Sequence, residues 1–218
     1  LRAAGYDVFA PKPAAGRSYC CGRTYLSAGM VDKARAEAER LVTALYPLAR
    51  SGVRIVGLEP SCTLALRDEV PALLGTAQAE AVAEATLTFA ELVEADRPEF
   101  PVPAAAARRP VKLHGHCHQK AFDLVKPAEA VLRDIAGAEV EVIETSCCGM
   151  AGAFGYGRDT YDVSIRMAEA SLLPAVRAAP DDAAIVADGT SCRCQIDDGT
   201  GRKAVHLARH LDRLISGS

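Results

Sequence analysis

The chain has 218 residues, a formal net charge of −3 at pH 7 and a hydrophobic fraction of 50%. This length suits one large folded domain or two small ones. The charge balance argues against a nucleic-acid partner. No apolar run approaches the roughly 18 residues of a membrane span, and residues 1–5 do not resemble a signal peptide.

The eight cysteines are the most informative feature of the composition. They are Cys20, Cys21, Cys62, Cys117, Cys147, Cys148, Cys192 and Cys194. In a small secreted protein an even number would suggest disulfides, but this chain is long enough to fold without them and its cysteines cluster in motifs. The pattern favours metal ligation in a reducing compartment. We therefore expect a cytoplasmic location and leave peripheral attachment to the inner membrane open.

The first half is predicted to alternate strands and helices. Its expected elements are strands over 6–9 and 53–58 and helices over 30–50, 63–74 and 78–95. Apolar residues in 30–50 recur at helical spacing, with charges on the other face. The continuous apolar run over 53–58 is typical of a buried strand. Ser61 is expected near the start of the helix that follows.

Residues 96–110 contain four prolines. We interpret 97–110 as a linker between a first half over 1–96 and a second half over 111–218. The elements expected in the second half are strands over 111–117, 139–144 and 183–187, and helices over 127–135, 161–178 and 203–215. The long helix over 161–178 is expected to break near Pro174.

The cysteine motifs recur in the same order in both halves. Cys20-Cys21-Gly22 corresponds to Cys147-Cys148-Gly149, and Ser61-Cys62 corresponds to Ser191-Cys192. The strand that ends at Cys117 has no counterpart before the first half, so we expect this chain to begin inside the first repeat of a longer protein. Alternating strands and helices predict an α/β fold of two pseudo-repeated halves, with mostly parallel sheets flanked by helices.

Three cysteine segments of the second half directly follow predicted strands. The carboxyl ends of parallel strands share one edge of a sheet, where ligands collect. We therefore expect Cys117, Cys147, Cys148 and Cys192 to form one metal site, with Cys194 as an additional ligand. Soft thiolates select zinc, copper(I) or iron–sulfur clusters. Five thiols on separated segments favour an iron–sulfur cluster, with a tetrahedral zinc ion as the alternative.

Two further groups of residues belong to this hypothesis. Gly149 and Gly152 are expected to wrap the backbone closely around the bound group, with amides that donate to sulfur. Cys20, Cys21 and Cys62 are candidate metal ligands in the first half. That half has fewer thiols, so its site is expected to be the weaker one.

The pattern Cys117…Cys147-Cys148-Gly149…Cys192 resembles the cysteine-rich CCG domain family, which includes the heterodisulfide reductase B subunit, the glycolate oxidase iron–sulfur subunit and lactate-utilisation proteins. The strings over 114–121 and 147–156 are more similar to the C-terminal part of large FAD-linked oxidases. This resemblance implies a 4Fe-4S electron-transfer domain of an FAD-linked oxidoreductase that acts on D-2-hydroxy acids, of the D-lactate, glycolate or D-2-hydroxyglutarate type.

The resemblance also implies partners. FAD and ferredoxin-like clusters would lie on upstream domains of the parent protein, and electrons would pass to an acceptor. This chain alone is not expected to turn over substrate. The alternative is a non-catalytic docking module in which zinc only stabilises the fold.

The chain departs from the family pattern where that pattern closes with two cysteines separated by two residues. Here Cys194 follows Cys192 by two positions, and Gln195 stands where the second cysteine belongs. In the first half Ala65 occupies the matching place. Ligation at both sites is therefore expected to be altered or incomplete.

Several polar residues near the motifs have a structural explanation. His116 and His118 flank Cys117; one of them ligates metal or donates to cluster sulfur, or both cap loops at the sheet edge, and capping is favoured. A nucleophilic Cys117–His116 pair is disfavoured, because it leaves the double cysteines unexplained. Asp188 is expected to cap the following helix. His206 and His210 are expected on a solvated helix face, and the glycines over 149–157 do not match a dinucleotide-binding fingerprint.

Overall fold

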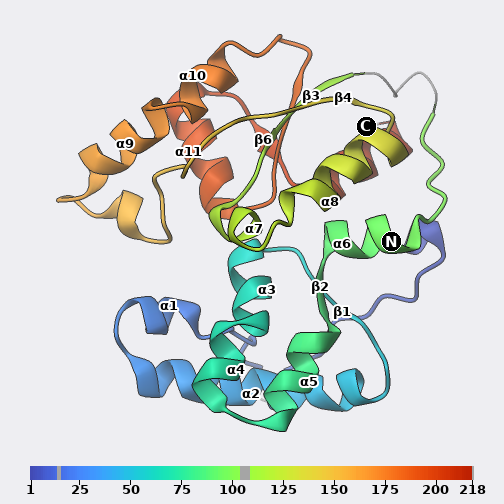
Figure 1. Ribbon diagram of the computed structural model, residues 1–218, viewed down its shortest axis with the longest axis vertical. Coiled ribbons are helices and arrows are strands. Elements are labelled where there is room, and N and C mark those ends of the chain that lie inside the picture. Colours follow the sequence, from blue (N-terminus) through green and yellow to red (C-terminus); the bar gives the residue numbers. More distant parts are fainter. Residues whose placement is uncertain (14–15, 104–108, 218) are drawn as a thin grey trace. The chain divides into compact units, whose positions relative to one another are not determined.

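The structure is a computed structural model that describes residues 1–13, 16–103 and 109–217. It divides into two compact units, Leu1–Phe89 and Ala90–Ser218. Each unit has a parallel sheet flanked by helices (Figure 1), which confirms the predicted α/β class. Part of the linker expected over 97–110, residues 104–108, lies outside the described residues. None of the helices in the described ranges combines the length and apolar character needed to cross a membrane.

The first unit packs short helices around a two-stranded sheet. Its elements are η1 (Arg2–Ala4), α1 (Arg23–Ser27), α2 (Val31–Arg50), β1 (Ile55–Gly57), α3 (Pro60–Arg67), α4 (Glu69–Leu74), α5 (Ala77–Ala85) and β2 (Thr86–Thr88). Strands β1 and β2 are parallel, with Ile55 opposite Thr86. Helix α2 packs against α5. The core between these helices consists of Ala38, Val42, Leu45, Leu66, Val70, Ala79 and Val82.

Three expectations for the first unit are wrong. Residues 6–9 form no strand; they lie in a loop where Arg2 Nη2 donates to the Val8 carbonyl at 2.7 Å. The helix expected over 78–95 is interrupted by β2, because β-branched threonines suit a strand and β1 needs a partner for its backbone groups. Helix α3 begins at Pro60 instead of near residue 63, since proline is well suited to the first helical position.

The second unit is built on a four-stranded sheet. Its elements are α6 (Phe89–Asp96, which starts at the unit boundary), β3 (Pro110–His114), α7 (Cys117–Ala121), α8 (Val125–Ala130), η2 (Val131–Ile135), β4 (Glu139–Val142), η3 (Phe154–Tyr156), α9 (Tyr161–Glu169), α10 (Leu172–Arg177), β5 (Ala184–Ala187), α11 (Thr190–Thr200), β6 (Ala204–Val205) and α12 (Leu207–Ser216). The strand order is β4-β3-β5-β6 and every pair is parallel. The carboxyl ends of β3, β4 and β5 therefore lie along one edge of the sheet.

The second unit also shows where local sequence signals were incomplete. The expected long helix breaks between Glu169 and Leu172, because the Pro174 ring conflicts with the carbonyl of the residue four positions earlier. The segment that contains Cys192 forms helix α11, which was not predicted. The closing helix starts at Leu207 instead of near residue 203, because β6 pairs with β5 first.

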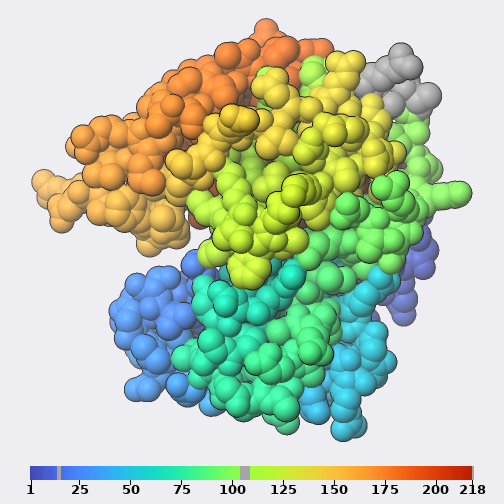
Figure 2. Space-filling model, viewed as in Figure 1, coloured from blue at the N-terminus to red at the C-terminus, as the bar shows by residue number. Residues whose placement is uncertain are grey.

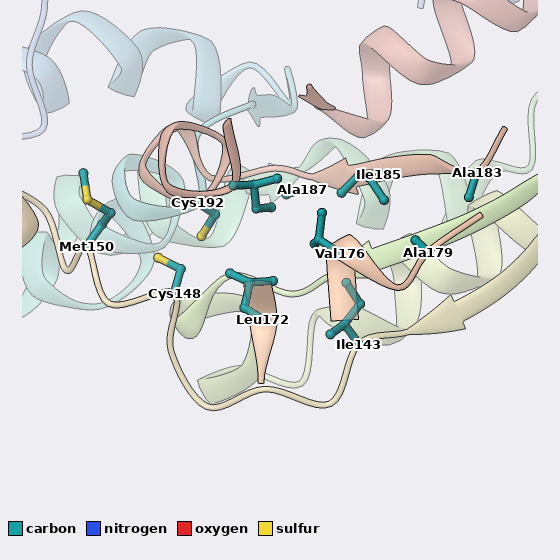
Figure 3. Close-up of a cluster of buried hydrophobic side chains, with 11 residues drawn as sticks. Ile143, Cys148, Met150, Leu172, Val176, Ala179, Ala183, Ile185, Ala187 and Cys192 are labelled. Carbon is teal, nitrogen blue, oxygen red and sulfur yellow. The ribbon is translucent and has the colours of Figure 1, made fainter. Parts of the chain in front are cut away.

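The core of the second unit contains two of the cysteines. Figure 3 shows the cluster, whose members are Ile143, Cys148, Met150, Leu172, Val176, Ala179, Ala183, Ile185, Ala187, Cys192 and Ile196. Since Cys148 and Cys192 belong to this core, the site described below is anchored in the best-packed part of the unit.

Truncation of Leu172 to alanine is expected to lower the free energy of unfolding by about 2–5 kcal/mol, because this side chain is 0% exposed and leaves a cavity. Val163→Ala, on α9 and 37% exposed, is the control and should change stability by no more than about 0.5 kcal/mol. Urea denaturation of both variants measures the difference. Similar losses in the two variants would contradict the position of the core.

Candidate metal centre

The structure brings four cysteines from three segments together. Strand β3 leads through residues 115–116 to Cys117 at the start of α7, β4 leads to Cys147 and Cys148, and β5 leads into α11 with Cys192. Their thiols form a row of contacts: Cys117 meets Cys147, Cys147 meets Cys148, and Cys148 meets Cys192. Figure 3 shows the sulfur atoms of Cys148 and Cys192 turned toward one another.

Hydrogen bonds between these thiols make their acidities unequal. Donation from Cys117, then from Cys148, lowers the pKa of Cys147 to about 2. Donation from Cys148 lowers the pKa of Cys192 to about 5, although burial opposes it. The pKa values of the donors, Cys117 and Cys148, are raised by the same bonds and by burial. Because the thiolate is the form that binds metal, the row already holds two poised ligands.

The loop after the double cysteine is held by Gly149. Its amide donates to Cys147 Sγ at 3.3 Å, and its φ of +89° is left-handed. A Cβ there would lie 2.2 Å from the carbonyl oxygen of Ser164 on α9. Gly152 has a φ of +70° with nothing within 4 Å of a Cβ position. The close approach at Gly149 is therefore to a neighbouring helix.

The double cysteine of the first unit adopts the same turn. Gly22 has a φ of +81°, its amide donates to Cys20 Sγ at 3.4 Å, and a Cβ would lie 2.6 Å from the Ala34 carbonyl on α2. A hydrogen bond from Cys62 lowers the pKa of Cys21 to about 6. The first unit thus repeats the local geometry of the second, with a contact between only two of its three thiols.

A buried polar network fixes α7 against the end of β5. Gln119 Nε2 donates to Asp188 Oδ2 at 2.8 Å, and the His116 amide donates to Gln119 Oε1 at 3.0 Å. The His118 amide donates to His116 Nδ1 at 3.2 Å, so His116 caps α7, as favoured from the sequence. Asp188 Oδ1 accepts from the Leu207 amide at 3.0 Å. Asp188 therefore caps α12 instead of α11, and the network positions Cys117 near Cys192.

Sequence reasoning missed His114, the last residue of β3. The side chain is 1% exposed, and its Nδ1 lies 3.2 Å from Thr145 Oγ1. The ring lies beside the thiols of Cys147 and Cys192 and lowers the pKa of both. A histidine that ends a buried central strand was the available signal, because such a residue reaches the sheet edge where the cysteines gather.

Lys120 provides a positive charge at the same edge. Its Nζ donates to Thr145 Oγ1 at 2.7 Å and to the Thr145 and Ser146 carbonyls at 2.5 and 3.2 Å. Burial lowers the pKa of Lys120, while the four clustered thiolates oppose that change. The lysine thus ties α7 to the loop before the double cysteine and offsets negative charge in the row.

The structure does not bring Cys194 to the row. Cys192 and Cys194 are two positions apart on α11, so their side chains leave opposite sides of the helix. The Cys194 thiol instead contacts the Tyr156 hydroxyl and raises the pKa of Tyr156. Tyr156 is 67% exposed and belongs to the segment from η3 to α9, which is yellow to orange in Figure 2.

Three other polar side chains support the packing of this unit. Gln195, which occupies the place of the missing cysteine, donates through Nε2 to Ser164 Oγ at 3.2 Å. His210 is 6% exposed and burial lowers its pKa, while His206 Nδ1 accepts from the Ala208 amide at 3.0 Å and caps α12. The expectation that His206 and His210 lie on a solvated face is therefore wrong.

In the described ranges, no three His, Cys, Asp or Glu side chains already surround one ion-sized position. The thiols of Cys117, Cys147, Cys148 and Cys192 form a row and not a cage. The stretch from β3 to α11 that carries this row has the organisation of a cysteine-rich domain.

The cysteine-rich domain family CCG matches residues 111–197, which include all four cysteines of the row. The second unit therefore carries a CCG domain, as the motifs predicted. Among curated proteins, the chain is similar to the C-type subunit of the anaerobic glycerol-3-phosphate dehydrogenase of Escherichia coli K12, with 28% identity over 195 residues. It is also similar to the D-2-hydroxyglutarate dehydrogenases of E. coli K12 (29% over 189 residues) and Pseudomonas putida KT2440 (30% over 171 residues).

These matches cover 86%, 86% and 78% of this chain, respectively. They cover only 47%, 18% and 16% of the three relatives. The chain thus spans about half of the first relative's length and less than a fifth of the other two. It is related to parts of larger dehydrogenases.

Proposed function

We propose that this chain is the cysteine-rich electron-transfer part of a larger oxidoreductase and that its second unit holds an iron–sulfur cluster. The observation that carries the proposal is the row of four thiols from three strand ends inside a CCG domain. Cys117, Cys147, Cys148 and Cys192 would be the ligands. When bound, the cluster would supply a site that accepts and releases single electrons.

The donor set fits such a cluster. A single zinc ion needs four ligands directed at one point, whereas several irons can each take a thiolate along a row. The Gly149 amide that donates to Cys147 Sγ, and the nearby Lys120 ammonium, would offset the negative charge of thiolate ligands. A 4Fe-4S cluster is the form we propose, with Gly149 and Gly152 in the loop around it.

The parent protein is proposed to be an FAD-linked dehydrogenase of D-2-hydroxy acids. Support comes from the similarity to D-2-hydroxyglutarate dehydrogenases. FAD and ferredoxin-like clusters would lie outside this chain, and an acceptor would take the electrons in the cytoplasm or at the inner membrane. The similarity to one subunit of a glycerol-3-phosphate dehydrogenase supports the same electron-transfer role within a multi-subunit enzyme. Cys20, Cys21 and Cys62 would form a weaker metal position.

The test is metal and sulfide analysis of anaerobically purified protein. We expect several irons per chain and a brown colour from thiolate-to-iron absorption. The double variant Cys147→Ser, Cys148→Ser should lose both, because it removes half of the row. Cys62→Ser is the control in the first unit and should keep most of the iron. Full metal retention by the double variant would refute the assignment, and one zinc per chain without colour would favour the docking module.

A further inference from the structure

His114 has one ring nitrogen whose role the site description leaves unexplained. Its Nδ1 lies 3.2 Å from Thr145 Oγ1. Its Nε2 is buried and has no hydrogen-bond partner of ordinary geometry in the described part of the chain. The ring nevertheless lies against the Cys192 thiol, which is 0% exposed. A buried polar atom without a partner is costly, so an acceptor is expected to complete this position when the site is filled.

The neighbours of the ring determine which nitrogen carries the hydrogen. Lys120 Nζ donates to Thr145 Oγ1 at 2.7 Å, and an ammonium group can only donate. The Thr145 hydroxyl hydrogen must therefore point elsewhere, and its other neighbour is His114 Nδ1. If Nδ1 accepts from the hydroxyl, the hydrogen of a neutral imidazole is on Nε2. The series Lys120, Thr145, His114 thus directs an N–H toward the row of thiols.

We infer that His114 is a positioning residue whose Nε2–H donates a hydrogen bond to sulfur at the Cys192 end of the metal centre. This inference rests on the proposed function, because the acceptor is a thiolate or cluster sulfur of that centre. The donor stabilises negative charge on sulfur, which is larger in the reduced state. It therefore favours reduction and raises the potential of the centre.

Two variants separate this role from packing and from ligation. The glutamine in His114→Gln can place an amide N–H near the position of Nε2, whereas the asparagine in His114→Asn reaches only the position of Nδ1. Both variants and the unaltered 218-residue chain would be reconstituted anaerobically with iron and sulfide. Iron content would be measured, and the one-electron reduction would be followed by redox titration with electron paramagnetic resonance.

We expect equal iron in all three proteins, since the four thiolates remain. His114→Asn should lower the equilibrium constant for reduction about tenfold, which corresponds to about 59 mV for one electron, and His114→Gln should restore most of it. An unchanged potential in His114→Asn would overturn the inference, and so would iron loss in both variants, because that marks a ligand. Iron retained by the double Cys147→Ser, Cys148→Ser variant would instead refute the proposed function.

A second measurement needs no iron and no altered histidine. Ring ¹⁵N chemical shifts of metal-free, reduced protein labelled at histidine report which nitrogen carries hydrogen. We expect His114 to be protonated at Nε2, and this preference should persist in Thr145→Ser and weaken in Thr145→Val, which lacks the hydroxyl. Protonation at Nδ1 in the unaltered chain would overturn the inference even if every His114 variant failed to fold.

Discussion

Replacing Cys192 by serine is expected to empty the proposed metal centre, whereas replacing Cys194, two positions along the same helix, should leave it filled. Cys192 ends the row of thiols and contacts Cys148, while Cys194 contacts Tyr156. Loss of an outer-shell partner typically weakens metal binding about 10–100-fold, so loss of a ligand should cost at least that much. Iron content after anaerobic reconstitution measures the effect.

The two serine variants are closely matched because they make the same atomic change in one helix, α11. Far-ultraviolet circular dichroism of the metal-free proteins checks that both fold alike. Equal iron loss would mean that α11 turns to bring Cys194 into the centre, as the sequence spacing first indicated. Full retention by Cys192→Ser would remove Cys192 from the ligand set.

The convergence of the cysteines was predictable because it follows from topology. Cys117, Cys147 and Cys192 each follow a strand, and parallel strands present their carboxyl ends at one edge. The failure at Cys194 has a local cause. The segment over 190–200 is too polar to show helical periodicity, so the opposite directions of Cys192 and Cys194 were not visible from spacing alone.

Other features depend on partners that are distant in sequence. Strand β2 forms because β1 offers it a backbone ladder, and tertiary pairing of this kind overrides the helical signal around it. The hydrogen on His114 is assigned through Thr145 and Lys120, which reach the ring only in the folded unit. Sequence patterns indicate which residues arrive at the sheet edge, but not which groups they meet there.

Gly149 shows the same division between local and tertiary causes. Substitution by alanine is expected to lower the free energy of unfolding by about 3 kcal/mol or more, against about 1–2 kcal/mol for Gly152→Ala. Both residues have left-handed backbone, with φ of +89° and +70°, so both variants carry that strain. Only at position 149 would the added Cβ also lie 2.2 Å from a backbone oxygen, that of Ser164, where no flexible side chain can move aside.

Urea denaturation of the two alanine variants gives the difference directly, and equal losses would show that α9 yields at no cost. Metal analysis of the same proteins adds a second comparison. In Gly149→Ala the displaced loop should pull the amide away from Cys147 Sγ, 3.3 Å distant, and weaken metal retention. Gly152→Ala leaves that donor in place and should retain metal. A loss of stability in Gly149→Ala without any loss of metal would separate the packing role of this glycine from its support of the centre.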